Sequence, residues 1–327
     1  MAIHFGKGTR VFAKTLPFVL LRMGVGALFG LLAVLYFGVV AWVLFTLVDG
    51  GSISGMIALV GLLLAAGFFA WVVRLARRYV LYLVSAGHIA VIAHILDTGA
   101  APDSQLSYGI GQVKENFASA SALFAVDQLV KGVIKQFNRA VASLANWVSF
   151  VPALKNIIEI LRRAIAMAAS YIDEAILAHI FLSDEPNNWR AARDGVVLYG
   201  KTWKPVLTAT IIIVVGMYVA AFVGLLLLTP LASVLGNLSP TFEYAGWIMV
   251  AGIALTGYLG FLRPWVKTVV ITTFILEARD ETPDSQTVDD LVSKSEKFSE
   301  LMAKAESEEA AETDPDAPEP KTPGSAA

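Results

Sequence analysis

The sequence contains no cysteine, and charged residues are scarce in it. The absence of cysteine excludes disulfide bonds, thiolate chemistry and cysteine-ligated zinc. Asp, Glu, Lys and Arg make up 16% of the 327 residues, whereas a soluble domain carries about a quarter. Hydrophobic residues account for 56%. This balance predicts several segments that are buried in lipid.

The sequence also lacks several short motifs that accompany catalytic sites. It has no G-x-S-x-G elbow, no H-E-x-x-H and no dinucleotide-binding fingerprint. Basic residues gather beside the apolar runs instead of forming a stripe with interleaved aromatic residues, which argues against nucleic-acid binding. We therefore expect a protein that is not an enzyme, holds no cofactor or metal ion and has no nucleic-acid partner.

Long apolar runs are what this sequence has in excess. Residues 23–48 contain no charge, and at about 1.5 Å per helical residue such a run crosses a hydrocarbon core of about 30 Å. A second apolar run covers residues 56–73 and ends at Arg74, and the loop between the runs holds only Asp49 as a charge. The two runs predict a transmembrane hairpin within residues 23–78.

A second hairpin is predicted from the uncharged runs 206–228 and 244–262. Lys201 and Lys204 precede it and Arg263 follows it. Basic residues thus lie at the open end of both hairpins, which places these ends in the cytoplasm by the positive-inside rule. We expect a multi-pass protein of the plasma membrane whose N- and C-termini are both cytoplasmic.

The residues between the hairpins, 79–200, are predicted to form a helical insert. Residues 79–96 are largely apolar and form either a third span or a helix at the membrane interface. His88 and His94 in this stretch are six residues apart and do not share a helical face, which argues against a common metal ion. Residues 140–154 are short for a span and favour a re-entrant or interfacial segment. The insert therefore lies partly in the membrane.

A charged stripe on the insert is one part of the candidate site. Asp127, Lys131, Lys135 and Arg139 recur every four residues and therefore lie on one face of a helix whose other face is apolar. The stripe either lines a water-filled path, because charges at membrane depth face a cavity or a partner, or belongs to a cytoplasmic helix and faces water.

An acidic pair is the other part of the candidate site. Asp173 and Glu174 lie in the apolar frame SYIDEAILAHIF. A buried carboxylate there would bind a cation or carry a proton. Alternatively, the pair forms a salt bridge between helices with one of three arginines, Arg162, Arg163 and Arg190.

The sequence predicts an all-α polytopic membrane protein with four to six spans. Its segments are a basic amphipathic N-terminus (1–22), a transmembrane hairpin (23–78), the insert (79–200), a second hairpin (201–276), a cytoplasmic tail helix (277–306) and a disordered acidic tail (307–327).

The order of parts from Glu115 to Met302 resembles the C-terminal half of the choline transporter-like family. The corresponding residues are Ala169-Ser170-Tyr171, Arg190-Ala191-Ala192-Arg193, the spans beginning near Val206 and Tyr244, Val266-Lys267-Thr268 and Phe274-Ile275-Leu276-Glu277. The sequence departs from the family in two ways that concern charge: Lys267 stands where the family has Asp, and Ser183-Asp184-Glu185 replaces a Gly-Lys pair. The resemblance implies a similar architecture and does not extend to choline as the substrate.

Two functions follow from these features. The first is a permease or channel for a small solute or ion, of the choline transporter-like type, with the six charged residues of the insert along its pathway. The alternative is a membrane scaffold or assembly factor that transports nothing and binds a cytoplasmic partner. The lipid bilayer is the expected partner in both, and either protein could form a homo-oligomer.

Overall fold

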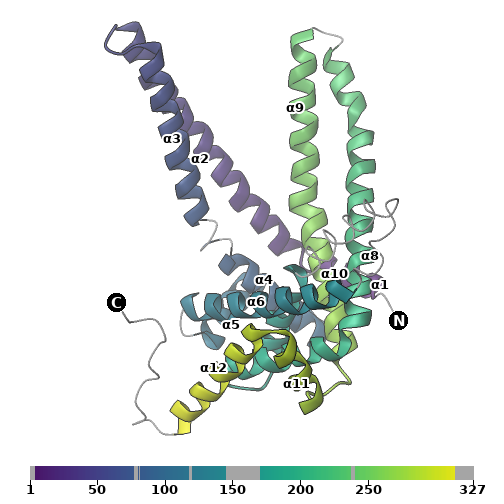
Figure 1. The fold of residues 1–327 in the computed structure, drawn as a ribbon. Coiled ribbons are helices and arrows are strands. Elements are labelled where there is room, and N and C mark those ends of the chain that lie inside the picture. Colours follow the sequence, from purple (N-terminus) through teal and green to yellow (C-terminus); the bar gives the residue numbers. More distant parts are fainter. Residues whose placement is uncertain are drawn as a thin grey trace.

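The computed structural model describes residues 4–76, 80, 82–117, 120–144, 170–236 and 240–313. Within these ranges the chain forms helices and no strands, so the predicted all-α fold is confirmed. Two helical hairpins project from the same side of a helical body and diverge from each other (Figure 1). The re-entrant segment expected within 140–154, apart from residues 140–144 in a helix, lies outside the described residues.

The first hairpin consists of α2 (Leu16–Asp49) and α3 (Gly55–Ala76). Its two helices contact each other through aromatic side chains: Tyr36 stacks on Phe69 and donates a hydrogen bond of 3.1 Å to the carbonyl of Ala65. No residue in the most apolar stretch of either helix is buried by protein. The outer faces of this hairpin are therefore left to lipid.

The second hairpin consists of α8 (Asn188–Gly236) and α9 (Pro240–Gly257). The boundary predicted at residue 200 between the insert and this hairpin falls inside a continuous helix. The first part of α8 is amphipathic and packs in the body, and the apolar part beyond it projects away from the body (Figure 1). One helix thus links the body to the membrane.

The chain returns from α9 to the body through a π-helical turn, Tyr258–Leu262, and α10 (Arg263–Ala278). The turn directly precedes Pro264. Proline has no N–H to donate and its ring clashes with the carbonyl four residues earlier, and a π-bulge is one of the ways in which a helix accommodates such a break. The helix therefore continues past Pro264, and α10 carries it into the body core.

Four helical stretches in the described residues are long and apolar enough to cross a membrane: Leu16–Asp49, Gly55–Ala76, Asn188–Leu231 and Met249–Ala278. A fifth is counted if α5 (Gln105–Asn116) and α6 (Ala120–Leu144), which meet at a bend of 83°, form one broken span. The four spans that the sequence predicts in the two hairpins are therefore confirmed as helices of sufficient length and apolar composition.

The body contains α4 (Tyr82–Thr98), α5, α6 and the helical residues 170–182. Although α4 is largely apolar and has no strongly polar face, it is enclosed by protein: ten of its residues are buried. A helix that is apolar all round is buried either in a large core or in a membrane, and α4 lies in the core of the body. Its main neighbour is α5, and it also packs against α1 and α10.

Three further helices cover the body. α1 (Phe5–Lys14) packs on α10, and α11 (Ser285–Lys294) and α12 (Glu296–Thr313) pack on α6 and α8. The tail predicted as one helix over 277–306 is thus two helices, which meet at Ser295. α12 runs to Thr313, so residues 307–313 of the segment predicted to be disordered are helical. Residues 314–327 lie outside the described part of the chain.

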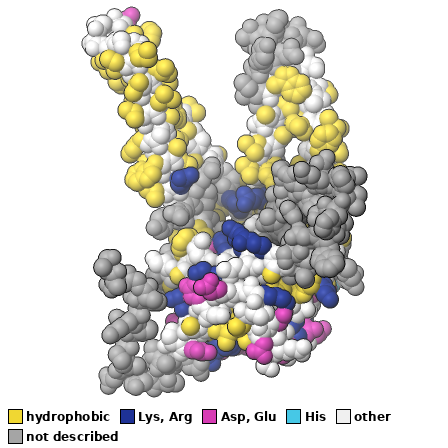
Figure 2. Space-filling view, viewed as in Figure 1, with side chains coloured by type: hydrophobic (Ala, Val, Ile, Leu, Met, Phe, Trp, Pro, Cys, Tyr) yellow, Lys and Arg dark blue, Asp and Glu magenta, His cyan; other side chains and the backbone are white. Residues whose placement is uncertain are grey.

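Side-chain chemistry divides the molecule into two parts. Hydrophobic side chains cover the projecting hairpins, whereas Lys, Arg, Asp and Glu gather on the body and at the feet of the hairpins (Figure 2). This division is the one that a bilayer imposes, because charged groups are costly in the hydrocarbon region. The change from apolar to charged side chains thus falls at the feet of the hairpins (Figure 2).

Candidate functional site

Charged side chains from three elements, most of them buried, meet in the body. Asp127 and Lys131 come from α6, Asp173 and Glu174 from the helical residues 170–182, and Lys267 from α10. We call these five residues the charge network. Because consecutive residues of a helix point about 100° apart, Asp173 and Glu174 face different neighbours. The segment 170–182 is thereby tied to α6 on one side and to α10 on the other.

The first half of the network is centred on Lys131. Its Nζ lies 2.5 Å from Oδ2 of Asp127, one turn earlier on α6, and 3.4 Å from Oδ2 of Asp173. Both carboxylates are buried, whereas 41% of the Lys131 side chain is exposed. The network therefore reaches the surface of the body through this lysine, whose amine also lies 5.9 Å from the centre of the Tyr82 ring.

The second half is centred on Lys267, whose side chain is only 3% exposed. Its Nζ lies 3.0 Å from Oε1 of Glu174 and donates a hydrogen bond of 2.5 Å to Oγ of Ser85 on α4. An unpaired ammonium would be very costly at this depth. Lys267 therefore requires both partners, and it joins α10 to α4 and to residues 170–182.

Arg22 of α2 extends the electrostatic environment of the network. Arg22 lies within electrostatic range of both Glu174 and Arg263, so α2 brings a further cation near the Glu174 carboxylate. Opposite charges that lie close together offset part of the desolvation penalty that a single buried ion would carry.

Asp173 is the least satisfied member of the network. Neither of its carboxyl oxygens accepts a hydrogen bond from a residue in the described part of the chain. Burial, reinforced by the negative charge of Glu174, raises the pKa of Asp173 well above its ordinary value, although Lys131 acts in the opposite direction. The structure thus favours a proton on Asp173 more than on an exposed aspartate.

His88 lies near the network but takes no part in its ion pairs. Its ring stacks on Phe18 at 5.4 Å, and among the described residues its Nε2 has no hydrogen-bond partner. Burial lowers the pKa of His88 well below its ordinary value, and Lys267 and Arg22 lower it further. His94, the other histidine of α4, packs against Tyr108. The two histidines thus lie in separate environments.

The structure brings together four of the six candidate residues predicted from the sequence: Asp127, Lys131, Asp173 and Glu174. Lys135 and Arg139 are exposed and belong to none of the ion pairs of the network, so the four-residue stripe is divided between core and surface.

Two contributors to the network were not predicted. Lys267 and Ser85 are absent from the candidate residues, although a lone lysine in the apolar stretch 264–276 indicates a buried partner. Of the three arginines considered as partners of the acidic pair, Arg190 has an ion pair with Glu185 at 3.7 Å. Arg162 and Arg163 lie outside the described residues.

The stretch from Gly195 to Thr202 reads G-V-V-L-Y-G-K-T and matches the G-x-x-x-x-G-K-[ST] form of phosphate-binding loops. It lies inside the continuous helix α8, where the backbone N–H groups are used by the helix and cannot cradle a phosphate. Lys201 pairs with Glu281 and Asp284, and Oγ1 of Thr202 donates to the carbonyl of Leu198. The pattern is therefore no nucleotide site.

The two glycines of this pattern serve helix packing. A Cβ at Gly195 would come 3.0 Å from both His179 and Ile176, and one at Gly200 would come 2.8 Å from Thr287. Both positions therefore need the smallest side chain so that residues 170–182 and α11 can lie close to α8.

The chemistry open to the network follows from its composition. The carboxylates that could bind a metal are engaged by lysines, and the described ranges contain no cluster of three or more metal-ligating side chains. The network holds no nucleophile beside a base. Two roles are left to the network: it holds the helices of the body to α10, and it can hold a proton at Asp173.

Comparison with protein-family models, curated proteins and solved structures gives no match for this chain. The resemblance to the choline transporter-like family therefore stays a prediction.

Proposed function

We propose that this protein is an integral membrane scaffold of the plasma membrane, whose helical body lies on the cytoplasmic side and binds a soluble partner. The side follows from Arg22, Arg74 and Arg263, which lie at the body ends of the apolar stretches, because basic residues favour the cytoplasmic face. The body would then sit directly beneath the inner leaflet.

The observation that carries this proposal is the separation of the hairpins. They approach each other at their feet, where Met23 of α2 contacts Gly260, and diverge beyond that point (Figure 1). The apolar stretches of α2 and α3 are entirely unburied. A transport pathway needs spans that enclose polar side chains, whereas here Lys267 is the one residue of the charge network that lies within the four apolar stretches. The arrangement suits an anchor better than a conduit.

A permease or channel is the second candidate, and one observation favours it. Asp173 is a buried carboxylate that lacks a hydrogen bond from the described residues, and it connects through Lys131 to the surface of the body. Such a group suits a proton or cation relay. For transport, the hairpins of a second copy would have to complete the enclosure, so this candidate requires a homo-oligomer.

Flux measurements separate the two candidates. The purified chain is reconstituted in vesicles, and uptake of protons, Na⁺, K⁺ and choline is measured for the native protein and for Asp173→Asn. If the protein is a scaffold, uptake into its vesicles should equal uptake into protein-free vesicles. A flux that Asp173→Asn abolishes would instead assign the permease, provided that the variant retains its melting temperature in detergent.

The scaffold also predicts contacts at the exposed part of the charged stripe. A photo-crosslinking residue is placed at Lys135 or Arg139, and as a control at Ile57, which faces lipid on α3. In intact cells the two body positions should give the same discrete protein adduct, and position 57 should give none. Adducts that are equal at all three positions, or absent from the body positions, would contradict the scaffold.

A further inference from the structure

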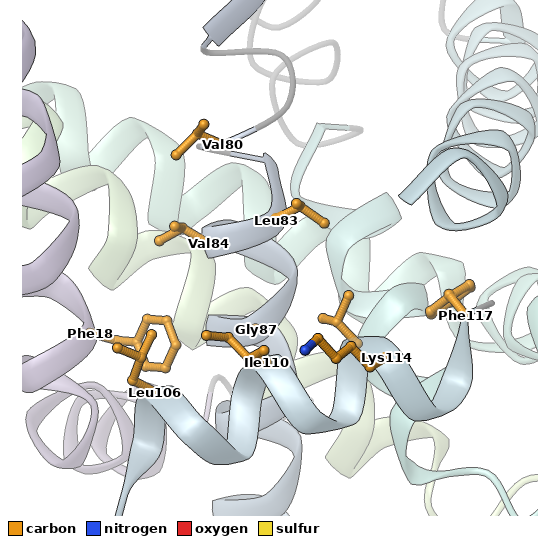
Figure 3. Close-up of a pocket in the computed structure, with 10 residues that line it drawn as sticks. Phe18, Val80, Leu83, Val84, Gly87, Leu106, Ile110, Lys114 and Phe117 are labelled. Atoms are coloured by element: carbon orange, nitrogen blue, oxygen red, sulfur yellow. The ribbon is translucent and has the colours of Figure 1, made fainter. Parts of the chain in front are cut away.

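An apolar pocket of about 540 Å³ opens at the foot of the first hairpin. Its walls come from α2, from α4 and from α5, and Val80 lies at its upper edge (Figure 3). The volume falls within the range of about 300–1,000 Å³ that is usual for small-molecule sites. None of the buried charges of the network lines this pocket.

The lining is apolar with one exception. Phe18, Leu83, Ile110 and Phe117 represent the hydrophobic wall, and Lys114 is its single charged residue. Figure 3 shows the Lys114 amine directed into the pocket. Lys114 makes no ion pair with any residue that the structure describes. The pocket thus offers a hydrophobic volume together with one free positive charge.

The rim of the pocket is exposed although it is hydrophobic. Leu106 is 44% and Ile110 is 47% exposed, and Val80 and Leu83 are exposed as well. Contiguous apolar surface of this kind marks an interaction site or a membrane contact.

The height of the pocket identifies what covers it. Phe18 lies five residues before Met23, where the uncharged stretch of α2 begins, and this corresponds to about 7.5 Å along the helix. The headgroup layer of a bilayer leaflet is about 5–8 Å thick. The wall formed by Phe18 therefore lies at headgroup depth, next to the apolar stretch of α2.

We propose that this pocket binds an anionic phospholipid of the bilayer, with one acyl chain in the apolar volume and the phosphate paired with Lys114. The acyl chain matches the lining, and the anionic headgroup matches the unpaired amine. A zwitterionic lipid would fill the same volume but would bring a cation toward Lys114 together with its phosphate. This site is independent of the scaffold proposal, because it uses none of the residues on which that proposal depends.

The absence of native cysteine allows a direct test in the full-length chain. Ile110→Cys on the pocket rim and Ile57→Cys on the lipid-facing side of α3 are each labelled with bimane. The proteins are reconstituted in phosphatidylcholine vesicles that contain bromine-labelled acyl chains, carried either on phosphatidylglycerol or on phosphatidylcholine. Bromine quenches the bimane on contact, so quenching reports which lipid occupies each position.

At position 110 we expect brominated phosphatidylglycerol to be preferred about fivefold, which is the effect of one basic residue near a membrane surface. Lys114→Gln, at an exposed position, should remove this preference without changing the melting temperature. Val84→Phe, which narrows the pocket, should reduce quenching by both lipids. At position 57 both lipids should quench equally in all backgrounds.

Two outcomes would overturn the proposal. The first is an absence of quenching at position 110 while position 57 is quenched, because the pocket would then hold no acyl chain. The second is equal quenching by both headgroups that Lys114→Gln leaves unchanged, because the headgroup would then not be recognised by Lys114.

Discussion

Removal of the Lys267 ammonium is the sharpest test of the charge network. Lys267→Met keeps the length of the side chain and leaves Glu174 and Ser85 without their partner. Breaking a buried ion pair on one side costs about 3–5 kcal/mol. Because 24% of the Glu174 side chain is exposed and water can solvate it in part, we expect the lower end, about 3 kcal/mol.

The loss is measured as a shift of the thermal midpoint in detergent, followed by the native tryptophan fluorescence. At about 2–4 °C per kcal/mol for a chain of this order of size, Lys267→Met should melt about 6–12 °C below the native protein. Lys135→Met on the exposed face of α6 is the matched control and should lie within about 0.5 kcal/mol of native.

The double variant decides whether the loss comes from the pair. In Lys267→Met with Glu174→Gln, no uncompensated carboxylate remains, and residues in direct contact couple by about 0.5–3 kcal/mol. The double variant should therefore be more stable than Lys267→Met alone. If the two single effects simply add, Lys267 and Glu174 do not stabilise each other and the network is not the unit described above.

Three further predictions concern pH and packing. Burial raises the pKa of Asp173 above its ordinary value, so the contribution of its proton to folding stability is complete below about pH 4 and is lost as the pH rises through the folded pKa. The melting temperature of Asp173→Asn should therefore rise relative to that of the native protein between pH 4 and 8. A difference that stays constant with pH would contradict this. Burial lowers the pKa of His88, so the contribution of the neutral imidazole to folding stability is complete above about pH 6.5 and is lost as the pH falls toward the folded pKa. In His88→Phe the melting temperature should therefore fall less steeply as the pH is lowered below about 6.5. An unchanged fall would refute the assignment. A Cβ at Gly109 would come 2.7 Å from the carbonyl oxygen of Gly87, where α4 packs on α5. Gly109→Ala should therefore lower the free energy of unfolding by about 1–3 kcal/mol. The control Gly111→Ala, where a Cβ meets nothing within 4 Å, should be neutral or slightly stabilising in the same melting assay.

The spans could be predicted from the sequence because lipid imposes a simple rule. A run of about twenty uncharged residues has few alternatives to crossing a membrane, and residues 23–48 and 206–228 obey that rule without exception. The environment of α4 could not be predicted in the same way. Protein core and hydrocarbon are both apolar, so a largely apolar helix of 17 residues fits either.

The charge network could be predicted only in part, for a geometric reason. The pairing of Asp127 with Lys131 is local, since the two residues are one helical turn apart. The pairing of Glu174 with Lys267 joins residues 93 positions apart and depends on how α10 enters the body. No periodicity in the sequence encodes that approach. A lone lysine in an apolar stretch indicates that a partner exists without identifying it.

The two hairpins are attached to the body in different ways, and this difference gives the network its importance. Both helices of the second hairpin continue into the body core, through the first part of α8 and through α10. The first hairpin is attached mainly through the foot of α2, where Phe18 and Val19 are buried, since α3 has no buried residue. Lys267 holds α10 to α4 and to residues 170–182. A partner that moved the body would therefore move the second hairpin with it, whereas the first hairpin could follow lipid more freely.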